Sequence, residues 1–329
     1  MDRPVLPARR VSLSIVVPLY DEREVFPELA RRVGAAAGEG ECEVLLVDDG
    51  STDGTGALVR ELCGRDGRFV GVHFSRNFGH QMAVSAGLDL ARGDAVAVID
   101  GDLQDPPEMI APMLARLREG FDVVYAVRRD RKEGPFLRLA YAAFYRLLRA
   151  LSPMPIPLDS GDCCVMSRRV VDVIRASPER HRFVRGLRSY AGFRQTGHEY
   201  AREARAGGTP KYTFRRLLGL AADGVFTFSE RPLRIATAAG VLAAVGSLGC
   251  GGWLLASRLL YGREIPGSAA LAVGMFFLAG VQLLCIGILG EYVGRIHNEV
   301  KGRPNYVVES ISLGKGTGGA PEVRGGVPG

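Results

Sequence analysis

Two aspartates in the middle of the chain are spaced in a way that suits metal binding. Asp100 and Asp102 flank Gly101 and follow the apolar, β-branched run 95–99, which is typical of a strand buried in a parallel sheet. Because strand side chains alternate in direction, both carboxylates project to the same side, and the small Gly101 leaves room for a ligand. Carboxylate oxygens suit Mg²⁺ or Mn²⁺, which would also bind phosphate oxygens. An acidic turn exposed to water is the alternative, and for an isolated Asp-x-Asp it is the more frequent one.

Acidic residues also follow two other runs that are expected to be strands. Asp21 and Glu22 come after the first run, and Asp48 and Asp49 come after the second. In an open α/β sheet, ligands bind at the carboxyl ends of the parallel strands. Chance explains one acidic pair at such a position easily but three pairs poorly. The sequence therefore predicts one crevice that gathers all three pairs.

The elements that must position these residues alternate between strand and helix patterns. Short apolar runs predict strands at 13–17, 44–47, 69–74, 95–99 and 123–126. Helical periodicity predicts helices at 25–37, 55–63, 81–91 and 108–119. This alternation predicts an α/β domain with a doubly wound, mostly parallel sheet. None of the strand-to-helix turns carries the Gly-x-Gly-x-x-Gly of dinucleotide-binding folds or the Gly-x-x-x-x-Gly-Lys-Ser/Thr of P-loops.

Composition divides the chain into a globular part and an apolar part. Of the 329 residues, 47% are hydrophobic and 24% are charged, but residues 235–257 and 268–293 are almost uncharged. Each stretch has about the 20 residues that a helix needs to cross a bilayer, and soluble core helices rarely stay apolar on every face for so long. We therefore expect two transmembrane helices. Residues 1–10 lack an apolar signal run, so the globular part is expected to stay in the compartment where it is made.

Basic residues near the apolar stretches predict their orientation. They cluster before the first stretch and after the second, at Arg215, Arg216, Arg231, Arg234, Arg295, Lys301 and Arg303, whereas the connecting loop has only Arg258 and Arg263. The positive-inside rule then places both termini and the globular part in the cytoplasm, with two spans in the inner (cell) membrane. The six cysteines lack Cys-x-x-Cys spacing, which fits reduced thiols in that compartment. Because arginines flank the spans, the net charge of +6 points to anionic lipid rather than to nucleic acid.

Two segments outside the apolar stretches are amphipathic. Residues 136–151 gather arginines on one side of an expected helix, which either lies in the lipid headgroup layer or packs on the protein core. Residues 213–229 have a similar character, and residues 314–329 are glycine-rich and expected to be disordered. The expected organisation is a globular domain at 1–212, an interfacial helical region at 213–231, two transmembrane helices within 232–297 and a cytoplasmic, partly disordered tail at 298–329.

Four motifs carry a family resemblance. They are VVPLYDE at 16–22, VDDGSTDGT at 47–55, SRNFGHQ at 75–81 and DGDLQDPPE at 100–108. Together they resemble the inverting family 2 glycosyltransferases, which have a GT-A fold. More narrowly they resemble the polyprenyl-phosphate glycosyltransferases, namely dolichol-phosphate mannose synthases and bactoprenol glucosyltransferases. The resemblance continues through 160–162, 182–187, 211–212 and the two apolar stretches, so it covers nearly the whole chain.

A few positions depart from the pattern of that family. Asp21 stands where Asn is frequent and Gly101 where Ala is frequent, and both changes are expected to be mild. Cys163 and Cys164 stand where many bactoprenol glucosyltransferases have Phe-Arg. Any role of that arginine must therefore be filled elsewhere in this chain.

The resemblance implies a membrane-anchored, inverting hexosyltransferase. It would move a single sugar from a nucleotide sugar, UDP-glucose in preference to GDP-mannose, to undecaprenyl phosphate or another polyprenyl phosphate. A processive polysaccharide synthase of the same superfamily is one alternative, but such enzymes have more spans and a Gln-x-x-Arg-Trp motif, and the only tryptophan here is Trp253, inside a span. A non-catalytic membrane scaffold is another, against which the intact Asp100 and Asp102 argue. Assembly into a homo-oligomer is left open.

The nucleotide and the metal would share the crevice at the strand ends. Backbone and carboxylate acceptors suit the base and the ribose. The expected nucleotide-binding set is Pro18, Tyr20, Glu22, Asp48, Asp49, Ser51, Asp100, Gln104 and Tyr212. Asp100 and Asp102, with Gln104, are expected to hold the Mg²⁺ or Mn²⁺ that neutralises the leaving diphosphate, which makes Asp102 a catalytic residue.

Two residues near this crevice have two interpretations each. Asp53 is either a further contact to the donor or a structural residue that forms an Asx turn or a helix cap ahead of Thr55. His80 has the chemistry of a ligand or a base, but at the start of a helix we interpret it as a surface or packing residue.

The acceptor phosphate is expected to need cations rather than a base. A monoalkyl phosphate has a second pKa near about 6 and is already anionic at neutral pH. Arg128 and Lys211 complete the expected catalytic set by positioning the attacking oxygen, and Tyr212 would donate a hydrogen bond to it. Arg138 and Arg205 are further candidates, for which charge facing the membrane surface is an equal alternative.

Overall fold

A computed structural model describes residue 6 and residues 11–38, 40–128, 160–179, 182–200, 231–261, 268–314 and 322–324 of the chain. The described residues fall into two units. One unit holds a β-sheet and includes the segment from Arg303 onward, and the other holds two long helices.

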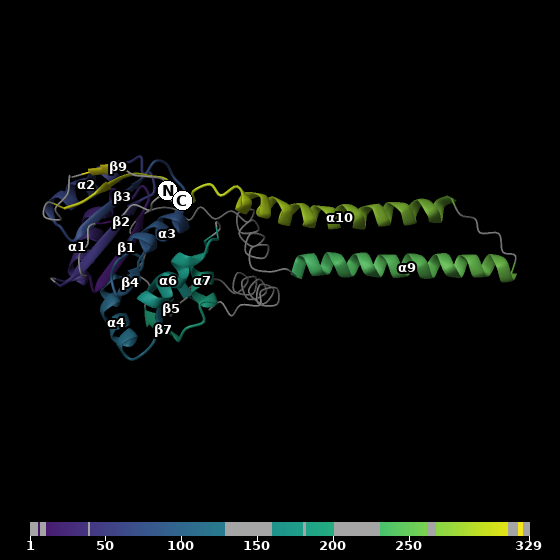
Figure 1. Cartoon of the computed structure of the whole chain (residues 1–329), viewed down its shortest axis with the longest axis horizontal. Coiled ribbons are helices and arrows are strands. Elements are labelled where there is room, and N and C mark those ends of the chain that lie inside the picture. The colour runs from purple at the N-terminus through teal and green to yellow at the C-terminus, as the bar shows by residue number, and fades with distance from the viewer. Residues whose placement is uncertain are drawn as a thin grey trace. The chain divides into compact units, whose positions relative to one another are not determined.

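The first unit is built on a mixed sheet. Over the described ranges its order is β7-β5-β6-β4-β1-β2-β3-β8-β9 (Figure 1). The strands are β1 (Leu13–Leu19), β2 (Cys42–Asp48), β3 (Phe69–Phe74), β4 (Ala95–Val98), β5 (Val123–Arg128), β6 (Ser160–Ser167), β7 (Gln195–Tyr200), β8 (Val308–Ser312) and β9 (Glu322–Arg324). Strands β1 to β4 are mutually parallel, as are β5 and β7, whereas β6 and β8 run antiparallel to their neighbours. The predicted doubly wound, mostly parallel sheet is confirmed.

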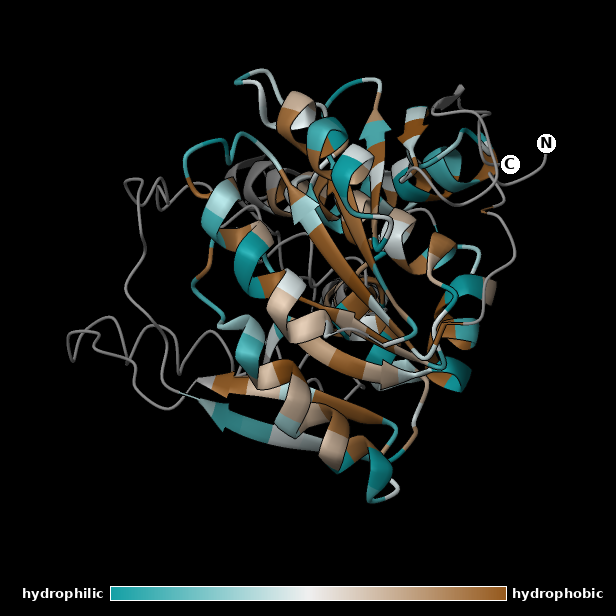
Figure 2. Ribbon diagram, turned by 90° about the vertical axis from the view of Figure 1, so that its left-hand side faces the viewer, coloured by the Kyte–Doolittle hydropathy of each residue, from teal (hydrophilic) through white to brown (hydrophobic). Residues whose placement is uncertain are grey.

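Helices cover both faces of this sheet and bury its apolar side chains (Figure 2). One face packs against α1 (Phe26–Ala37), α2 (Thr55–Arg65) and α4 (Ile110–Arg118). The other face packs against α3 (His80–Leu90), α6 (Arg168–Ala176) and α7 (Val184–Tyr190). Since strands β1 and β2 are buried along their whole length, their central residues form apolar runs rather than alternating patterns.

The sequence predicted the first part of this unit and missed its end. The helix expected at 108–119 begins as a 3₁₀ turn, η1 (Pro107–Met109), before α4. Strands β6, β7, β8 and β9 were not predicted. Both β8 and β9 come from the region expected to be a partly disordered tail, and they pair with each other at the edge of the sheet. Part of that region is therefore ordered.

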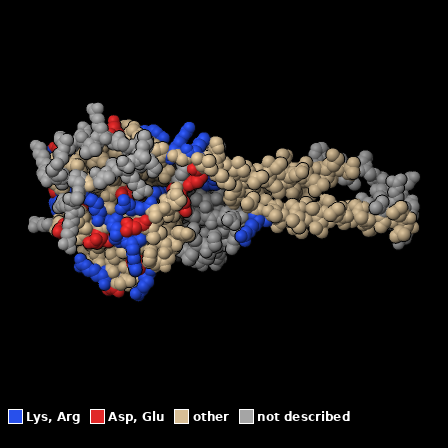
Figure 3. Space-filling view, viewed as in Figure 1, with Lys and Arg blue, Asp and Glu red and all other residues tan. Residues whose placement is uncertain are grey.

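The second unit contains the two predicted apolar helices, α9 (Arg231–Tyr261) and α10 (Ser268–Val300). Within them, Leu233–Trp253 and Phe277–Val300 are long and apolar enough to cross a membrane, with mean hydropathies of 1.6 and 1.7. Figure 3 shows that charged side chains are sparse along both helices. Their apolar side chains are exposed, unlike those of a soluble core helix. The amphipathic segments expected at 136–151 and 213–229 lie outside the described residues.

Candidate active site

The turns that follow β1 and β2 are held together by short polar contacts. The backbone N–H of Asp21 donates to Ser51 Oγ at 3.0 Å, and the N–H of Thr52 donates to Asp21 Oδ1 at 2.8 Å. Asp21 has a φ of 52°, a conformation that Asn and Asp tolerate best among residues with a side chain. The turn can therefore hold either Asp or Asn at this position. The N–H of Glu22 donates to Thr55 Oγ1 at 3.1 Å, which joins the first turn to α2.

Asp53 orders the same turn from its other side. Its Oδ1 accepts hydrogen bonds from the backbone N–H and the hydroxyl of Thr55 at 2.9 and 2.7 Å, and its Oδ2 accepts the N–H of Arg23 at 2.9 Å. The contact from Asp53 to the N–H two residues on is that of an Asx turn directly before α2, which favours a structural role for Asp53.

Asp48 and Asp49 are buried at the end of β2, with 5% and 2% exposure. Asp49 accepts the backbone N–H groups of residues 78–79 at 2.7 and 2.9 Å. Asp48 accepts the N–H of Ser51 at 3.0 Å through Oδ1, and its Oδ2 lies 3.1 Å from His73 Nδ1. Both carboxylates therefore order the backbone near the ends of β1 and β2. Their direct contact with a base or ribose stays a prediction.

Two glycines allow the backbone around the crevice to approach closely. Gly50 has a φ of 69°, and a Cβ there would lie 2.5 Å from the carbonyl carbon of Arg76. A Cβ on Gly101 would lie 2.8 Å from the carbonyl oxygen of Pro18. Alanine at position 101, expected from the sequence to be a mild change, would therefore force the backbone or its neighbours to shift in this chain.

The main charged site is an acid cluster in which Asp100 and Asp162 flank His80, and Asp102 is close enough to Asp100 to raise its pKa. His80 Nε2 lies 3.6 Å from Asp100 Oδ1 and 3.6 Å from Asp162 Oδ2. Asp162 belongs to β6, whose antiparallel direction brings its first residues to the edge where β1, β2 and β4 end. Arg185 of α7 donates to Asp162 Oδ1 from Nε and Nη2 at 3.3 and 3.0 Å. Sequence reasoning gave Asp162 and Arg185 no role and interpreted His80 as a packing residue.

The acid cluster changes the protonation of its own members. The pKa of Asp100 is raised to about 6, first by burial and then by the carboxylates of Asp162, Asp105 and Asp102, against the opposing effect of His80. Burial alone would raise the pKa of Asp162, but its close contacts with His80 and Arg185 lower it overall. Burial alone would lower the pKa of His80, but the nearby carboxylates of Asp162 and Asp100 raise it. The site favours an added positive charge.

The loop that carries Asp102 is held in an unusual conformation. Asp102 Oδ1 accepts the N–H of Gln104 at 3.1 Å, and Leu103 between them has a φ of 56°. For a bulky residue this conformation stores about 1–3 kcal/mol of strain, which the buried positions of Leu103 and Gln104 maintain. The loop is therefore fixed before any ligand binds.

The residues present fit a divalent metal that also binds substrate. Over the described ranges, no three His, Cys, Asp or Glu side chains converge to hold a metal by themselves. Asp100 Oδ1 is buried and has no hydrogen-bond partner. Mg²⁺ is usually bound through one or two carboxylates plus substrate phosphates and water. Asp100 and Asp102 supply that number of carboxylates.

Two features beside the acid cluster were not predicted. The hydroxyl of Tyr200, at the end of β7, donates to Asp105 Oδ1, while the buried Asp105 Oδ2 has no partner. Arg188 is 1% exposed and lies 5.2 Å from the ring centre of Tyr125. Its charge lowers the pKa of the Cys164 thiol, although burial outweighs this effect and raises that pKa overall. A guanidinium thus reaches the position where the family pattern has Phe-Arg and this chain has Cys163-Cys164.

The acceptor side is the least defined part of the site. Arg128 is the last residue of β5, and its side chain lies outside what the structure describes. Lys211, Tyr212, Arg138 and Arg205 lie outside the described residues. On the donor side, Pro18 is within β1, and Tyr20 directly follows it with 47% exposure.

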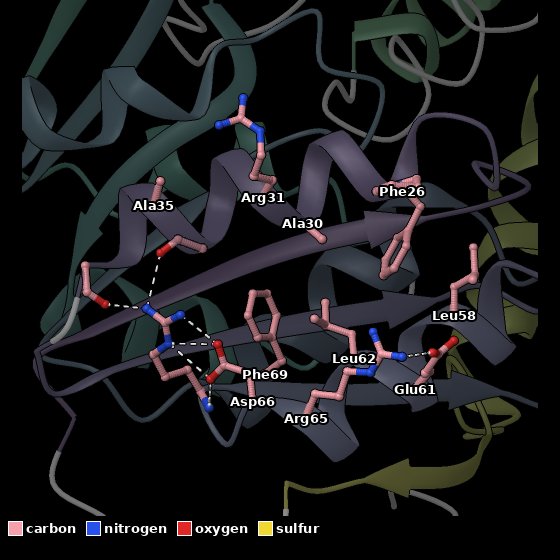
Figure 4. Close-up of a pocket in the computed structure, with 14 residues that line it drawn as sticks. Phe26, Ala30, Arg31, Ala35, Leu58, Glu61, Leu62, Arg65, Asp66 and Phe69 are labelled. Carbon is pink, nitrogen blue, oxygen red and sulfur yellow. Dashed lines mark hydrogen bonds and ion pairs between the residues drawn. The ribbon is translucent and has the colours of Figure 1, made fainter.

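A cavity of about 640 Å³ lies away from these residues, between α1 and α2 (Figure 4). Phe26, Leu62 and Phe69 contribute apolar walls, and Arg68 closes one end by donating to Asp66 and to the carbonyl groups of residues 34 and 38. None of the predicted site residues lines this cavity, so it has no part in the chemistry considered below.

Comparison with known proteins defines the class of this chain. Residues 14–175 match the family described as "Glycosyl transferase family 2". The "Uncharacterized glycosyltransferase YkcC" of Bacillus subtilis (strain 168) is 42% identical over 305 residues, which are 92% of this chain and 94% of the relative. The chain therefore belongs to the family 2 glycosyltransferases and is a glycosyltransferase.

Within that family, several relatives have names that state an acceptor. The "Bactoprenol glucosyl transferase" of Shigella phage SfII is 39% identical over 307 residues, covering 92% of this chain and 99% of the relative. The "Prophage bactoprenol glucosyl transferase homolog" of Escherichia coli (strain K12) is 37% identical over 304 residues, with coverage of 92% and 99%. Among solved structures, glucosyl-3-phosphoglycerate synthase from Mycobacterium tuberculosis, in complex with Mn²⁺, UDP-glucose and phosphoglyceric acid, is 20% identical with a TM-score of 0.44, covering 66% of this chain and 78% of that one.

Protons are expected to compete with metal at Asp100. We expect the affinity of the full chain for Mn²⁺ to fall by up to about tenfold per pH unit below about 6, the pKa of Asp100, because the protonated carboxyl does not bind metal. The stability of the metal-free protein should change in the opposite direction. Because the pKa of Asp100 is raised by folding, the free energy of unfolding should fall as pH rises from about 4 to about 6 and Asp100 ionises. Titration calorimetry with Mn²⁺ across this range measures the effect. An affinity that does not change with pH would contradict it.

Proposed function

We propose that the chain transfers a single glucose from UDP-glucose to undecaprenyl phosphate, or to another long polyprenyl phosphate, with inversion at the anomeric carbon. The observation that carries this proposal is the 39% identity to the bactoprenol glucosyl transferase of Shigella phage SfII. The alignment covers 92% of this chain, too much to leave out either long apolar helix. The acid cluster at the strand ends supplies the chemistry that such a transfer needs.

The proposed location follows from the apolar helices. Two spans, α9 and α10, would anchor the enzyme in the inner membrane, with the sheet unit in the cytoplasm beside the basic residues that flank the spans. A polyprenyl phosphate has an insoluble tail and a phosphate at the bilayer surface. An anchored enzyme meets this acceptor where its reactive oxygen lies.

On the donor side, the proposed roles use the contacts described above. Asp100 and Asp102 would bind Mg²⁺ or Mn²⁺, which supplies the positive charge that neutralises the leaving diphosphate. His80 lies between Asp100 and Asp162 and holds both carboxylates in place. Arg185 fixes Asp162 from the other side. The turns after β1 and β2 would surround the nucleoside.

On the acceptor side, the enzyme needs no general base. The acceptor phosphate is already anionic at neutral pH, so the site must position its oxygen against the anomeric carbon without neutralising it. His80 is not assigned the role of a base, because its Nε2 already lies 3.6 Å from both Asp100 and Asp162. Arg128 and Lys211 are the proposed positioning cations.

Variants of these cations should separate acceptor use from donor binding. We expect Arg128→Ala and Lys211→Ala to raise the KM for polyprenyl phosphate by about tenfold or more while sparing UDP binding, because each removes a charge-assisted contact to phosphate. Asp49→Ala should do the reverse. Initial rates and UDP titrations measure the two effects. A His80→Ala enzyme that binds both substrates normally but loses turnover by several orders of magnitude would restore a general base to the mechanism.

The proposed function is tested with purified full chain in detergent or nanodiscs. Undecaprenyl phosphate is incubated with a panel of radiolabelled UDP- and GDP-sugars, and the lipid products are separated. The expected result is one labelled sugar per lipid, from UDP-glucose. Labelled polymer would indicate a processive synthase, transfer from GDP-mannose would change the donor, and no transfer from any donor would overturn the proposal.

A further inference from the structure

A segment that follows α10 in the chain returns to the sheet unit, and we call residues 306–314 the C-terminal strap. Its strand β8 pairs antiparallel with β3. The ring of Tyr306 stacks on Phe74 with centres 5.1 Å apart, and its hydroxyl donates to Asp89 Oδ2 at 3.0 Å. A Cβ on Gly314 would lie 2.4 Å from the Cα of Gly67. The strap is thus packed closely against the sheet unit along its length.

The strap also completes a buried chain of three polar side chains. His73 of β3 is 1% exposed, and its Nδ1 lies 3.1 Å from Asp48 Oδ2 while its Nε2 lies 3.1 Å from Ser312 Oγ. Asp48 is the direct neighbour of His73 in the sheet. Ser312 is paired with Gly71, and a Cβ at that glycine would lie 3.1 Å from His73 Nε2. Because Gly71 has no side chain, the imidazole of His73 can reach Ser312.

The Asp48–His73–Ser312 chain is not a hydrolytic triad, although it has the same three residue types. A nucleophilic serine must reach a substrate, but Ser312 is only 6% exposed and His73 is only 1% exposed. Helix α2 covers the pair at Gly56, where a Cβ would lie 2.5 Å from Asp48 Oδ2. His73 and Ser312 can therefore affect a substrate only indirectly, through the position of Asp48.

The direction of the hydrogen bonds follows from the charge of Asp48. Burial alone would raise its pKa, but the hydrogen bonds from His73 and Ser51 outweigh burial and lower it. The ionised carboxylate only accepts, so His73 Nδ1 donates to Asp48 Oδ2, and Nε2 shares the second hydrogen bond with the hydroxyl of Ser312. The second oxygen of Asp48 accepts the N–H of Ser51, whose Oγ accepts the N–H of Asp21. Consecutive hydrogen bonds thus connect the strap to the turns at the crevice.

We propose that Ser312, acting through His73, positions Asp48 and the 48–51 turn for the donor nucleotide, so that the C-terminal strap is part of the donor site. His73 is then a positioning residue and does not touch the substrate. The inference rests on the proposed nucleotide donor and adds to it a contribution from residues beyond the second apolar helix.

The strap offers a matched pair of serines for the test. Ser310 and Ser312 are both buried on β8, with 3% and 6% exposure, but Ser310 Oγ has no hydrogen-bond partner. In the full chain, Ser312→Ala should raise amide hydrogen exchange in the peptide that covers residues 48–56 and weaken UDP binding by about threefold to tenfold, the worth of one hydrogen bond. The turnover number at saturating donor should stay within about twofold. Ser310→Ala should change none of these.

Variants of His73 separate the loss of this hydrogen-bond chain from a general loss of folding. His73→Leu removes both hydrogen bonds and should weaken UDP binding at least as much as Ser312→Ala, whereas His73→Gln keeps one side-chain donor and should recover part of the loss. If Ser312→Ala and Ser310→Ala give the same exchange and the same UDP affinity, the inference is overturned. The exchange measurement needs no nucleotide, so it separates this failure from a failure of the proposed donor, in which the unaltered chain itself would not bind UDP.

Discussion

Asp102→Ala is expected to reduce turnover by about 10³-fold while the protein stays folded, because the variant can no longer hold the charge that stabilises the leaving diphosphate. Oδ1 of Asp102 accepts a hydrogen bond from the N–H of Gln104. Asp102→Asn keeps an oxygen in that place and removes only the charge, so it should be nearly as inactive as the alanine variant. Excess EDTA should abolish the activity of the unaltered enzyme, and added Mg²⁺ or Mn²⁺ should restore it.

A matched control is available at the other end of the same strand. Asp94 precedes β4 and is exposed, so Asp94→Ala removes a carboxylate from the same element without touching the acid cluster. Its turnover should equal that of the unaltered enzyme. Thermal melts of all three variants check the fold. Full activity of Asp102→Asn, or full activity in excess EDTA, would remove the metal from the mechanism.

The sequence was sufficient to predict the parallel half of the sheet. Strands β1 to β4 are buried on both faces, so each contains a mostly apolar run that the sequence shows, and a helical pattern follows each of them. Strand β7 was missed because Gln195–Tyr200 is polar and only partly buried. Strand β8 was missed because it joins β3 across the whole apolar region, and no local pattern reports such a distant pairing.

The candidate site was predicted in part for a similar reason. The carboxyl ends of parallel strands lie at the same edge of a sheet, and this rule predicted that the carboxylates following β1, β2 and β4 lie near one another. Asp162 lies at the start of β6, and only the antiparallel direction of that strand brings it to the same edge. Arg185 and His80 join the site through their contacts with Asp162. The sequence shows these residues and their motifs, but only the order and direction of the strands show that they lie close together.

The second large effect is expected when the apolar helices are removed but the strap is kept. Replacing residues 231–302 with a flexible Gly/Ser linker leaves the sheet unit and β8 in one chain. This protein should bind UDP with nearly unchanged affinity but transfer to undecaprenyl phosphate in membranes at a rate lower by about 10²-fold or more, because anchoring raises the effective concentration of enzyme at the lipid surface. A short, water-soluble polyprenyl phosphate should recover most of the rate.

A chain that simply ends at Glu230 serves as the informative comparison. It lacks the apolar helices and also the strap, so the edge of β3 loses its partner strand and His73 loses Ser312. An uncovered strand edge promotes aggregation, and the donor site loses one of its supports. We therefore expect this chain to be less stable than the linker protein and to bind UDP more weakly, as melting temperatures and UDP titrations will measure. If the linker protein transfers to undecaprenyl phosphate in membranes as fast as the full chain, the two helices have some purpose other than delivering the site to its acceptor.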